Sequence, residues 1–281
     1  MRWKRIPGRG DMEDRRGQGG GTFGGGGLPI PIPKGKIGLI VLVLVVLFTL
    51  FGGRLGGGDD SEAPPGQGGG ETTANPGTPK DDAFEFAKFV SQDSQNVWER
   101  LVDQYPRATV VTFSSGTVSG CGPASSQTGP FYCPADNKVY LDLSFFRILS
   151  QRFGAPGDFA AAYVIAHEIG HHVQSVLGEE RRIREKQQQD PQNANRYLVQ
   201  LELQADCYAG VWANSASERG LLEPGDLQEG LGAAAAVGDD RLGARSREQW
   251  THGSSELREK WFRTGFDSGN PRDCDTSGVD I

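Results

Sequence analysis

The chain has 281 residues and a net charge of −7, and 36% of its residues are hydrophobic. This length allows one large domain or two small ones. Glycine and proline are concentrated in the first 80 residues, which hold 22 of the 41 glycines and 8 of the 16 prolines. The first 80 residues therefore lack the composition of a compact core, whereas the remainder has the composition of a globular domain.

Charge is distributed as unevenly as glycine. Residues 1–36 carry a net charge of +5 and the rest of the chain carries −12. An acidic domain offers no basic surface for phosphates, so we expect no nucleic-acid partner. Residues 1–36 also contain glycine runs, and they are predicted to form a disordered basic tail.

An apolar segment follows this tail. Residues 37–53 are 17 consecutive uncharged residues. At 1.5 Å per residue a helix of that length spans about 25 Å, close to the roughly 30 Å of a bilayer core. A buried core helix would need neighbours that the Gly/Pro-rich flanks do not provide, and a cleaved signal peptide would have a shorter basic region before it. Residues 37–53 are therefore predicted to be a transmembrane signal anchor in contact with the lipid bilayer.

The basic residues before this segment predict its orientation. Eight lysines and arginines precede residue 37, which favours a cytoplasmic N-terminus by the positive-inside rule. The expected protein is single-pass in the cell membrane, with its C-terminal domain extracytoplasmic. Residues 54–80 are polar and rich in glycine and proline, and they are predicted to form a flexible linker.

Residues 81–281 form the predicted domain. Apolar residues at helical spacing indicate a helix from residue 81 to near residue 105, and β-branched or alternating runs indicate strands at 109–113 and 138–143. Further helices are expected at 144–153, 158–178, about 194–217, 224–237 and about 254–266. The predicted fold class is α+β, mostly helical with a small β-sheet.

Four cysteines lie in the acidic part of the chain: Cys121, Cys133, Cys207 and Cys274. An even number favours disulfides in an oxidising compartment, in agreement with the predicted topology. Three pairings are available, and the short spacing favours Cys121 with Cys133, which leaves Cys207 with Cys274. A cysteine metal site or nucleophile is the alternative, but no C-x-x-C occurs.

The clearest chemical signal is His167-Glu168-Ile169-Gly170-His171 within an apolar stretch. Residues four apart share one helix face, so both imidazoles can bind one Zn²⁺, while Glu168 lies about 100° round the helix. There it can act on a water as general base. Two ordinary surface histidines are the alternative interpretation.

A catalytic zinc site needs a third protein ligand. Glu202 and Asp206 share a face of the next long predicted helix. Their neighbours are apolar, and carboxylates inside an apolar helix need a partner, which argues against a merely solvated acidic face. Glu202 is the predicted third ligand, and Asp206 is predicted to accept the N–H of a ligating histidine.

Two further histidines have less defined roles. His252 lies in Trp250-Thr251-His252-Gly253. It could be a spare ligand, a surface residue or a catalytic donor to the oxygen that becomes negative during peptide hydrolysis. His172 directly follows the second predicted ligand and is interpreted as a packing neighbour of the site.

The chain resembles a known family, the neutral zinc metallopeptidases, which belong to the zincins whose third ligand is a glutamate. The resemblance spans about residues 82–275 and rests on GCGPA, GPFYCP, KVYLDL, AHEIGHHVQ, ELQADCYAG, THGSS and WFRTGF. It implies His167, His171 and Glu202 as zinc ligands, Glu168 as catalytic base, and Asp206 as the residue that orients a histidine. It also implies that KVYLDL is the zincin edge strand, which pairs with an extended substrate.

The resulting functional prediction is a membrane-anchored, zinc-dependent endopeptidase acting on peptides or proteins. Zinc activates the attacking water, and Glu168 takes its proton and passes it to the leaving amine. Two alternatives are a membrane-tethered, zinc-stabilised binding module without catalysis and a zinc amidase that cleaves a non-peptide amide. Structural zinc sites are usually closed by four ligands, whereas three are evident here, which argues against the binding module.

Overall fold

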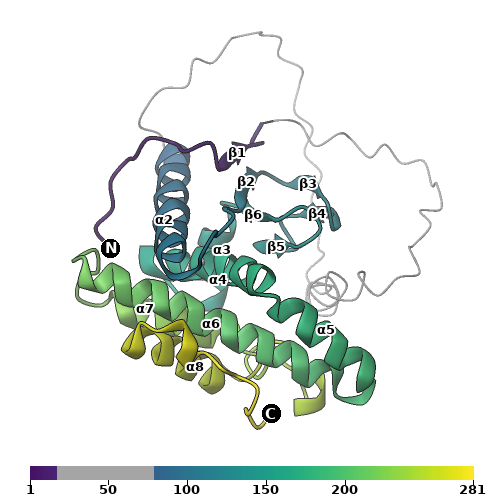
Figure 1. The fold of residues 1–281 in the computed structure, drawn as a ribbon. Helices are drawn as coiled ribbons and strands as arrows, with labels where there is room; N and C mark the ends of the chain where they lie inside the picture. The colour runs from purple at the N-terminus through teal and green to yellow at the C-terminus, as the bar shows by residue number, and fades with distance from the viewer. Residues whose placement is uncertain (18–78) are drawn as a thin grey trace, which may run out of the picture.

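The structure of the protein, a computed structural model, describes residues 1–17 and 79–281. In this part of the chain the fold is α+β, with a small sheet beside a larger group of helices, as Figure 1 shows. The predicted α+β class, mostly helical with a small sheet, is confirmed.

The main sheet has four strands in the order β1-β2-β6-β5. β1 (Met12–Asp14) and β6 (Lys138–Asp142) run parallel to β2 (Thr109–Phe113), and β5 (Phe131–Cys133) is antiparallel to β6. β3 (Gly116–Ser119) and β4 (Gly122–Ser125) form a separate hairpin. The two strands predicted from β-branched runs are confirmed. The short strands β3, β4 and β5 were not predicted, because they have only three or four residues each and lie in a loop rich in glycine and serine.

The expected role of KVYLDL as an edge strand is wrong. This segment forms β6, which has β2 on one side and β5 on the other. The edge strand next to β6 is β5, which is only three residues long. The alternation of β6 indicated a strand, but its position in the sheet depended on pairing with distant segments.

Seven α-helices cover the rest of the described chain: α2 (Pro79–Leu101), α3 (Phe145–Phe153), α4 (Asp158–Leu177), α5 (Glu179–Gln189), α6 (Ala194–Glu218), α7 (Asp226–Ala236) and α8 (Ser255–Ser268). Short 3₁₀ helices lie at Pro191–Asn193, Arg247–Gln249 and Pro271–Asp273. All six predicted helices are present within a few residues. α5 was not predicted, because Ile183 is the one buried residue of a strongly charged helix.

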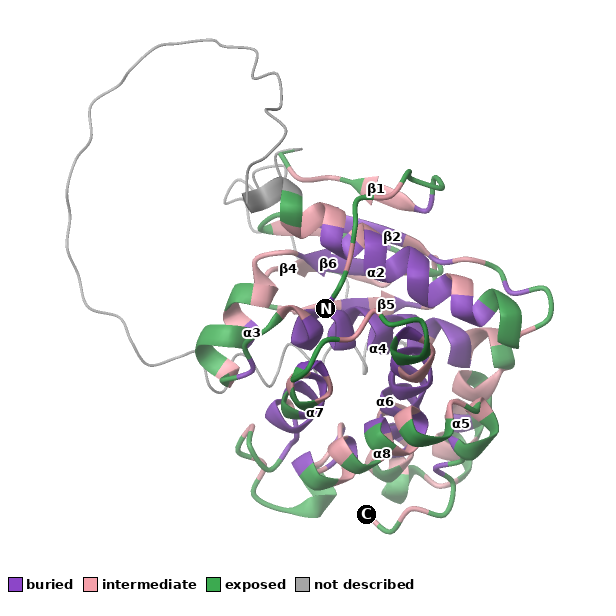
Figure 2. Ribbon diagram, turned by 90° about the vertical axis from the view of Figure 1, so that its left-hand side faces the viewer, coloured by how far each residue is buried: buried purple, intermediate pink, exposed green. Residues whose placement is uncertain are grey.

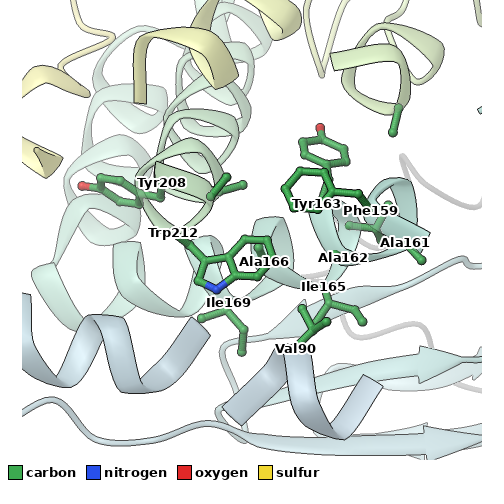
Figure 3. Packing of buried hydrophobic residues seen from close by; sticks show 14 of the residues in the cluster. Val90, Phe159, Ala161, Ala162, Tyr163, Ile165, Ala166, Ile169, Tyr208 and Trp212 are labelled. Atoms are coloured by element: carbon green, nitrogen blue, oxygen red, sulfur yellow. The ribbon is translucent and has the colours of Figure 1, made fainter. Parts of the chain in front are cut away.

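The core is built around α4, which Figure 2 shows in the buried colour along most of its length. Its apolar residues pack between α6 and α2 (Figure 3). Phe159 of α4 stacks on Trp212 of α6 with ring centroids 5.8 Å apart. A helix enclosed in this way has few rotational alternatives, so its polar residues are held at fixed positions.

Two glycines allow α4 and α8 to approach α6 closely. A Cβ on Gly170 of α4 would lie 3.0 Å from the carbonyl oxygen of Ala205 on α6. A Cβ on Gly265 of α8 would lie within 2 Å of the carbonyl oxygen of Cys207. The absence of side chains at these glycines therefore lets the backbones of α4, α6 and α8 come into contact next to His171 and Asp206.

Both predicted disulfides are present. Cys121, which lies between β3 and β4, pairs with Cys133 at the end of β5. Cys207 of α6 pairs with Cys274, which ties the segment after α8 to the helix it covers. No free cysteine occurs among the residues described.

The expectation of a disordered tail over residues 1–36 is wrong for residues 1–17, here called the N-terminal strap. The strap runs along α2 and adds β1 to the sheet beside β2 (Figure 1). Trp3 packs edge-on against Phe86 of α2, with ring centroids 5.5 Å apart. Composition alone favoured disorder, because the partners that order the strap lie more than 60 residues away along the chain.

Several predictions concern residues outside the described part. These are the remainder of the tail (18–36), the predicted signal anchor (37–53) and most of the predicted linker (54–80), of which residues 79 and 80 begin α2. Within residues 1–17 and 79–281, no helix is long and apolar enough to span a bilayer.

Candidate metal centre

His167 and His171 of α4 meet Glu202 of α6. The two histidine Nε2 atoms lie 3.1 Å apart. Glu202 Oε2 is 3.3 Å from Nε2 of His167, and Glu202 Oε1 is 3.5 Å from Nε2 of His171. The structure thus brings the three predicted ligands together around one point, although they come from two helices.

These distances suit a tetrahedral zinc ion. Zinc binds histidine nitrogen and carboxylate oxygen at about 2.0–2.2 Å, which places neighbouring ligand atoms roughly 3.3–3.6 Å apart. One nitrogen or oxygen atom from each of His167, His171 and Glu202 lies within 4.8 Å of the other two. The residues present therefore fit a zinc ion held by two imidazoles and a carboxylate.

The other ring nitrogen of each histidine has a hydrogen-bond acceptor. Nδ1 of His167 donates to Asp206 Oδ1 at 2.9 Å, and Nδ1 of His171 donates to Gln174 Oε1 at 2.8 Å. This leaves both Nε2 lone pairs directed at the shared point. Gln174 is fixed in turn through donation to the carbonyl oxygen of Leu201 at 2.6 Å. Sequence analysis missed Gln174, which the i, i+3 spacing from His171 could have indicated.

The electrostatics of the centre favour a positive charge. Burial lowers the pKa of His167, but Asp206 and Glu202 raise it more, to about 10. Burial likewise raises the pKa of Glu202, yet the surrounding histidines hold it well below its usual range. Because a metal ion and protons compete for the same Nε2 atoms, this field also favours metal binding.

Asp206 lies at the centre of a buried network on the far side of His167. Arg258 of α8 donates to both of its carboxylate oxygens, through Nε at 2.8 Å and Nη2 at 2.9 Å. The hydroxyl of Tyr163 donates to Asp206 Oδ1 at 2.5 Å. Burial raises the pKa of Asp206, and Arg258 and His167 bring it below its ordinary value. An ionised Asp206 can therefore hold His167 in one tautomer.

Arg258 and Tyr163 were not found by sequence analysis. Arg258 is 3% exposed and also donates to the carbonyl oxygen of Val237 at 3.2 Å. Its signal was weak, since one arginine in a charged helix gives no reason to expect burial. Only the packing of α8 on α6 shows that it neutralises Asp206.

The metal centre opens on a cavity of about 970 Å³. Glu168 lines this cavity beside the two histidines and is 8% exposed. The walls of the cavity also include residues of β5, α3, α5 and the segment between α7 and α8, among them Phe131, Tyr132, Phe145, Arg184, Leu242 and His252. A substrate in this cavity can therefore reach both the metal ligands and Glu168.

His252 lines the same cavity and is held in place by Asp239. Asp239 Oδ2 accepts the backbone N–H groups of Thr251, His252 and Gly253 at 2.7, 2.7 and 2.8 Å. Its Oδ1 lies 3.3 Å from Nδ1 of the His252 ring. The loop and the ring are thus positioned by one buried carboxylate that the sequence did not single out.

His172 points away from the metal ligands. Its Nε2 lies 2.6 Å from the carbonyl oxygen of Pro106, and its Nδ1 lies 3.2 Å from the hydroxyl of Tyr132 on β5. The residue is 1% exposed. It therefore ties α4 to the sheet, in accordance with the expected packing role.

A second cluster of acidic groups lies at the N-terminal ends of α4 and α7. Asp158, Asp226 and Glu229 bring one carboxylate oxygen each within 4.8 Å of the others. The α-ammonium group of Met1 lies among them, 2.6 Å from Asp158 and 3.3 Å from Asp226. Burial and the two neighbouring carboxylates raise the pKa of Glu229. The strap itself thus supplies the cation of this cluster.

Two imidazoles from an H-E-x-x-H helix and a glutamate from a later helix define a metal centre of the zinc metallopeptidase class. Comparison with known sequences agrees. Residues 1–277 match the family described as "Putative neutral zinc metallopeptidase". The chain therefore belongs to this family, whose cofactor is Zn²⁺.

Relatives of the chain occur in Escherichia coli and Mycobacterium tuberculosis. It is 42% identical to "Uncharacterized protein YpfJ" of Escherichia coli (strain K12) over 292 aligned positions, which cover 100% of both chains. It is 48% identical to "Uncharacterized protein Rv2575" of Mycobacterium tuberculosis over 202 positions, or 66% of this chain and 68% of the relative. No solved structure matches the chain.

Proposed function

We propose that the protein is a zinc-dependent endopeptidase that cleaves peptides or proteins in the 970 Å³ cavity. The observation that carries the proposal is the convergence of His167, His171 and Glu202 on one point beside Glu168. Three protein ligands leave a coordination position open, and the site faces a cavity large enough for a peptide segment. A structural zinc site would instead be closed by a fourth ligand.

Zinc at this site supplies a Lewis acid that activates water and polarises the scissile carbonyl group. Glu168 is the general base: its carboxylate accepts the proton of the attacking water and then donates it to the leaving amine. Asp206 and Gln174 hold the two histidines through their Nδ1 atoms, so the ligands need no reorientation during the reaction.

His252 is proposed as a catalytic donor. The hydroxyl of Thr251 lies 3.0 Å from Nδ1 of His252, and when it donates there Nε2 carries the ring proton and is the atom available to the cavity. A donor at this place stabilises the carbonyl oxygen of the substrate as negative charge develops on it. The three backbone N–H groups on Asp239 keep the loop in position without a contribution from substrate.

The decisive test is the Glu168→Gln substitution. We expect the variant to retain one equivalent of zinc and to lose casein or peptide hydrolysis by about 10²–10⁴-fold, because the amide cannot accept the water proton. Glu185→Gln on the exposed face of α5 is the matched control and should cleave at the unaltered rate. Hydrolysis by the Glu168→Gln variant at the unaltered rate would refute the assigned base.

We also propose that the domain works outside the cytoplasm, attached to the cell membrane through residues 37–53. Two disulfides among the described residues support an oxidising compartment. The apolar, uncharged composition of residues 37–53 supports lipid contact.

A further inference from the structure

The N-terminal strap makes the contacts of an integral part of the domain. Three backbone hydrogen bonds outside the regular β1–β2 pairing fix its ends: Arg2 N–H to Leu221 O at 2.7 Å, Val110 N–H to Asp11 O at 2.7 Å, and Arg15 N–H to Thr112 O at 2.8 Å. Together with the β1 pairing, they distribute the attachment over the whole strap. Such a distributed backbone attachment is typical of a permanent strand rather than an adventitious contact.

Asp11 provides the strongest side-chain contact. It is 8% exposed and accepts from Arg107 at 2.8 and 2.5 Å and from Gln92 of α2 at 3.2 Å. Burial of a carboxylate is unfavourable unless donors are already in place. The domain contributes all of these donors from segments that follow residue 78, so its surface is complementary to the strap.

The strap also covers apolar surface and a sheet edge. β2 has the sequence TVVTF, and Val110 and Val111 are fully buried. Without β1, this apolar strand would present an unpaired edge to solvent, which favours aggregation. Trp3 covers Phe86 of α2 in the same way. The domain therefore depends on the strap for one face.

These contacts constrain the path of the chain. Residues 1–17 and 79–281 can touch only if they share one aqueous compartment. A single crossing by residues 37–53 would put them on opposite sides of a bilayer core about 30 Å thick. A second crossing that would bring the chain back is excluded, because two helical crossings would need about 40 apolar residues and the segment has 17 uncharged ones.

We propose that the strap and the catalytic domain lie on the same side of the membrane, joined through β1 and Asp11. The predicted cytoplasmic N-terminus with an extracytoplasmic domain is replaced by a shared compartment. This proposal does not depend on peptidase activity.

Cysteine labelling of the full chain in cells tests the compartments. Gly8 of the strap and Gly278 near the C-terminus are both exposed, and a side chain at either meets no atom within 4 Å. We expect Gly8→Cys and Gly278→Cys to react alike with a membrane-impermeant maleimide, both before and after permeabilisation. Reaction of one cysteine in intact cells and of the other only after permeabilisation would overturn the proposal.

Charge reversal tests the contact itself. Asp11→Arg and Arg107→Asp should each lower the melting temperature of the full chain by several degrees, and the double variant should recover part of the loss. Asp103→Arg, at an exposed position just after α2, is the matched control and should leave the melting temperature unchanged. An Asp11→Arg variant that melts like the control would show that the strap is not docked.

Discussion

Two clusters of ionisable groups in this molecule have similar geometry and different chemistry. In the metal centre, two imidazoles and Glu202 converge beside a cavity. In the second cluster, Asp158, Asp226 and Glu229 converge at two helix N-termini, and the Met1 α-ammonium lies among them. Each cluster attracts a cation, but the second obtains one from its own chain.

The difference lies in what surrounds each cluster. Nδ1 of His167 and of His171 is already engaged by a neighbour, so each Nε2 atom carries the lone pair and faces the other histidine and Glu202. The second cluster has such a donor at 2.6 Å. Convergence of ligand atoms is therefore not sufficient evidence for a metal site, and the hydrogen-bond partners of those atoms must be counted.

The largest expected effect concerns the buried pair behind the metal centre. Arg258→Met should lower the free energy of unfolding by about 3–5 kcal/mol, because Asp206 would remain charged and unpaired in the core. Urea unfolding of the metal-free proteins measures this loss. The double variant Arg258→Met/Asp206→Asn should recover part of it, and additivity of the two losses would contradict a direct pair.

A smaller effect, on zinc affinity, distinguishes Glu202 as a ligand from Asp206, which orients a ligating histidine. Glu202→Ala should weaken zinc binding by more than about 100-fold, whereas Asp206→Asn should weaken it about 10–100-fold, as expected for an outer partner of a ligating histidine. Competition with a chromophoric chelator measures both values. Equal affinity in the two variants would count against Glu202 as a ligand.

The smallest effect concerns the second cluster. Asp226→Asn should lower the free energy of unfolding by about 1–2 kcal/mol through a weaker contact with the α-ammonium group of Met1. Its zinc affinity should equal that of the unaltered protein. Thermal unfolding and zinc content together check this, and a loss of zinc as large as that of Glu202→Ala would indicate that the two clusters are not independent.

Much of the site could be predicted because its information is local. The i, i+4 spacing of His167 and His171 places both on one helix face before any tertiary structure is known. Glu202 and Asp206 were recognisable because carboxylates in an apolar helix need partners. Arg258 and Tyr163 were not recognisable, because their role depends on how α8 and α4 pack on α6.

The N-terminal strap shows the opposite case. Its glycine-rich continuation and basic charge favour disorder, and nothing within residues 1–17 shows that α2 and β2 offer a matching surface. The same holds for β6, whose alternation predicts a strand but not its interior position in the sheet. Pairing partners distant in sequence decide these features, and single-sequence patterns do not contain them.

The amino-acid sequence by itself therefore determined the local features of this protein: a helix with the H-E-x-x-H pattern, a later helix with two carboxylates, two disulfides and an α+β domain. Periodicity and spacing act over a few residues, so they can be read without a fold. Only the tertiary structure decided which groups neutralise the buried charges, which strand borders the cavity and where the N-terminal strap lies. Those outcomes depend on contacts between segments far apart in the chain, where close packing selects one arrangement.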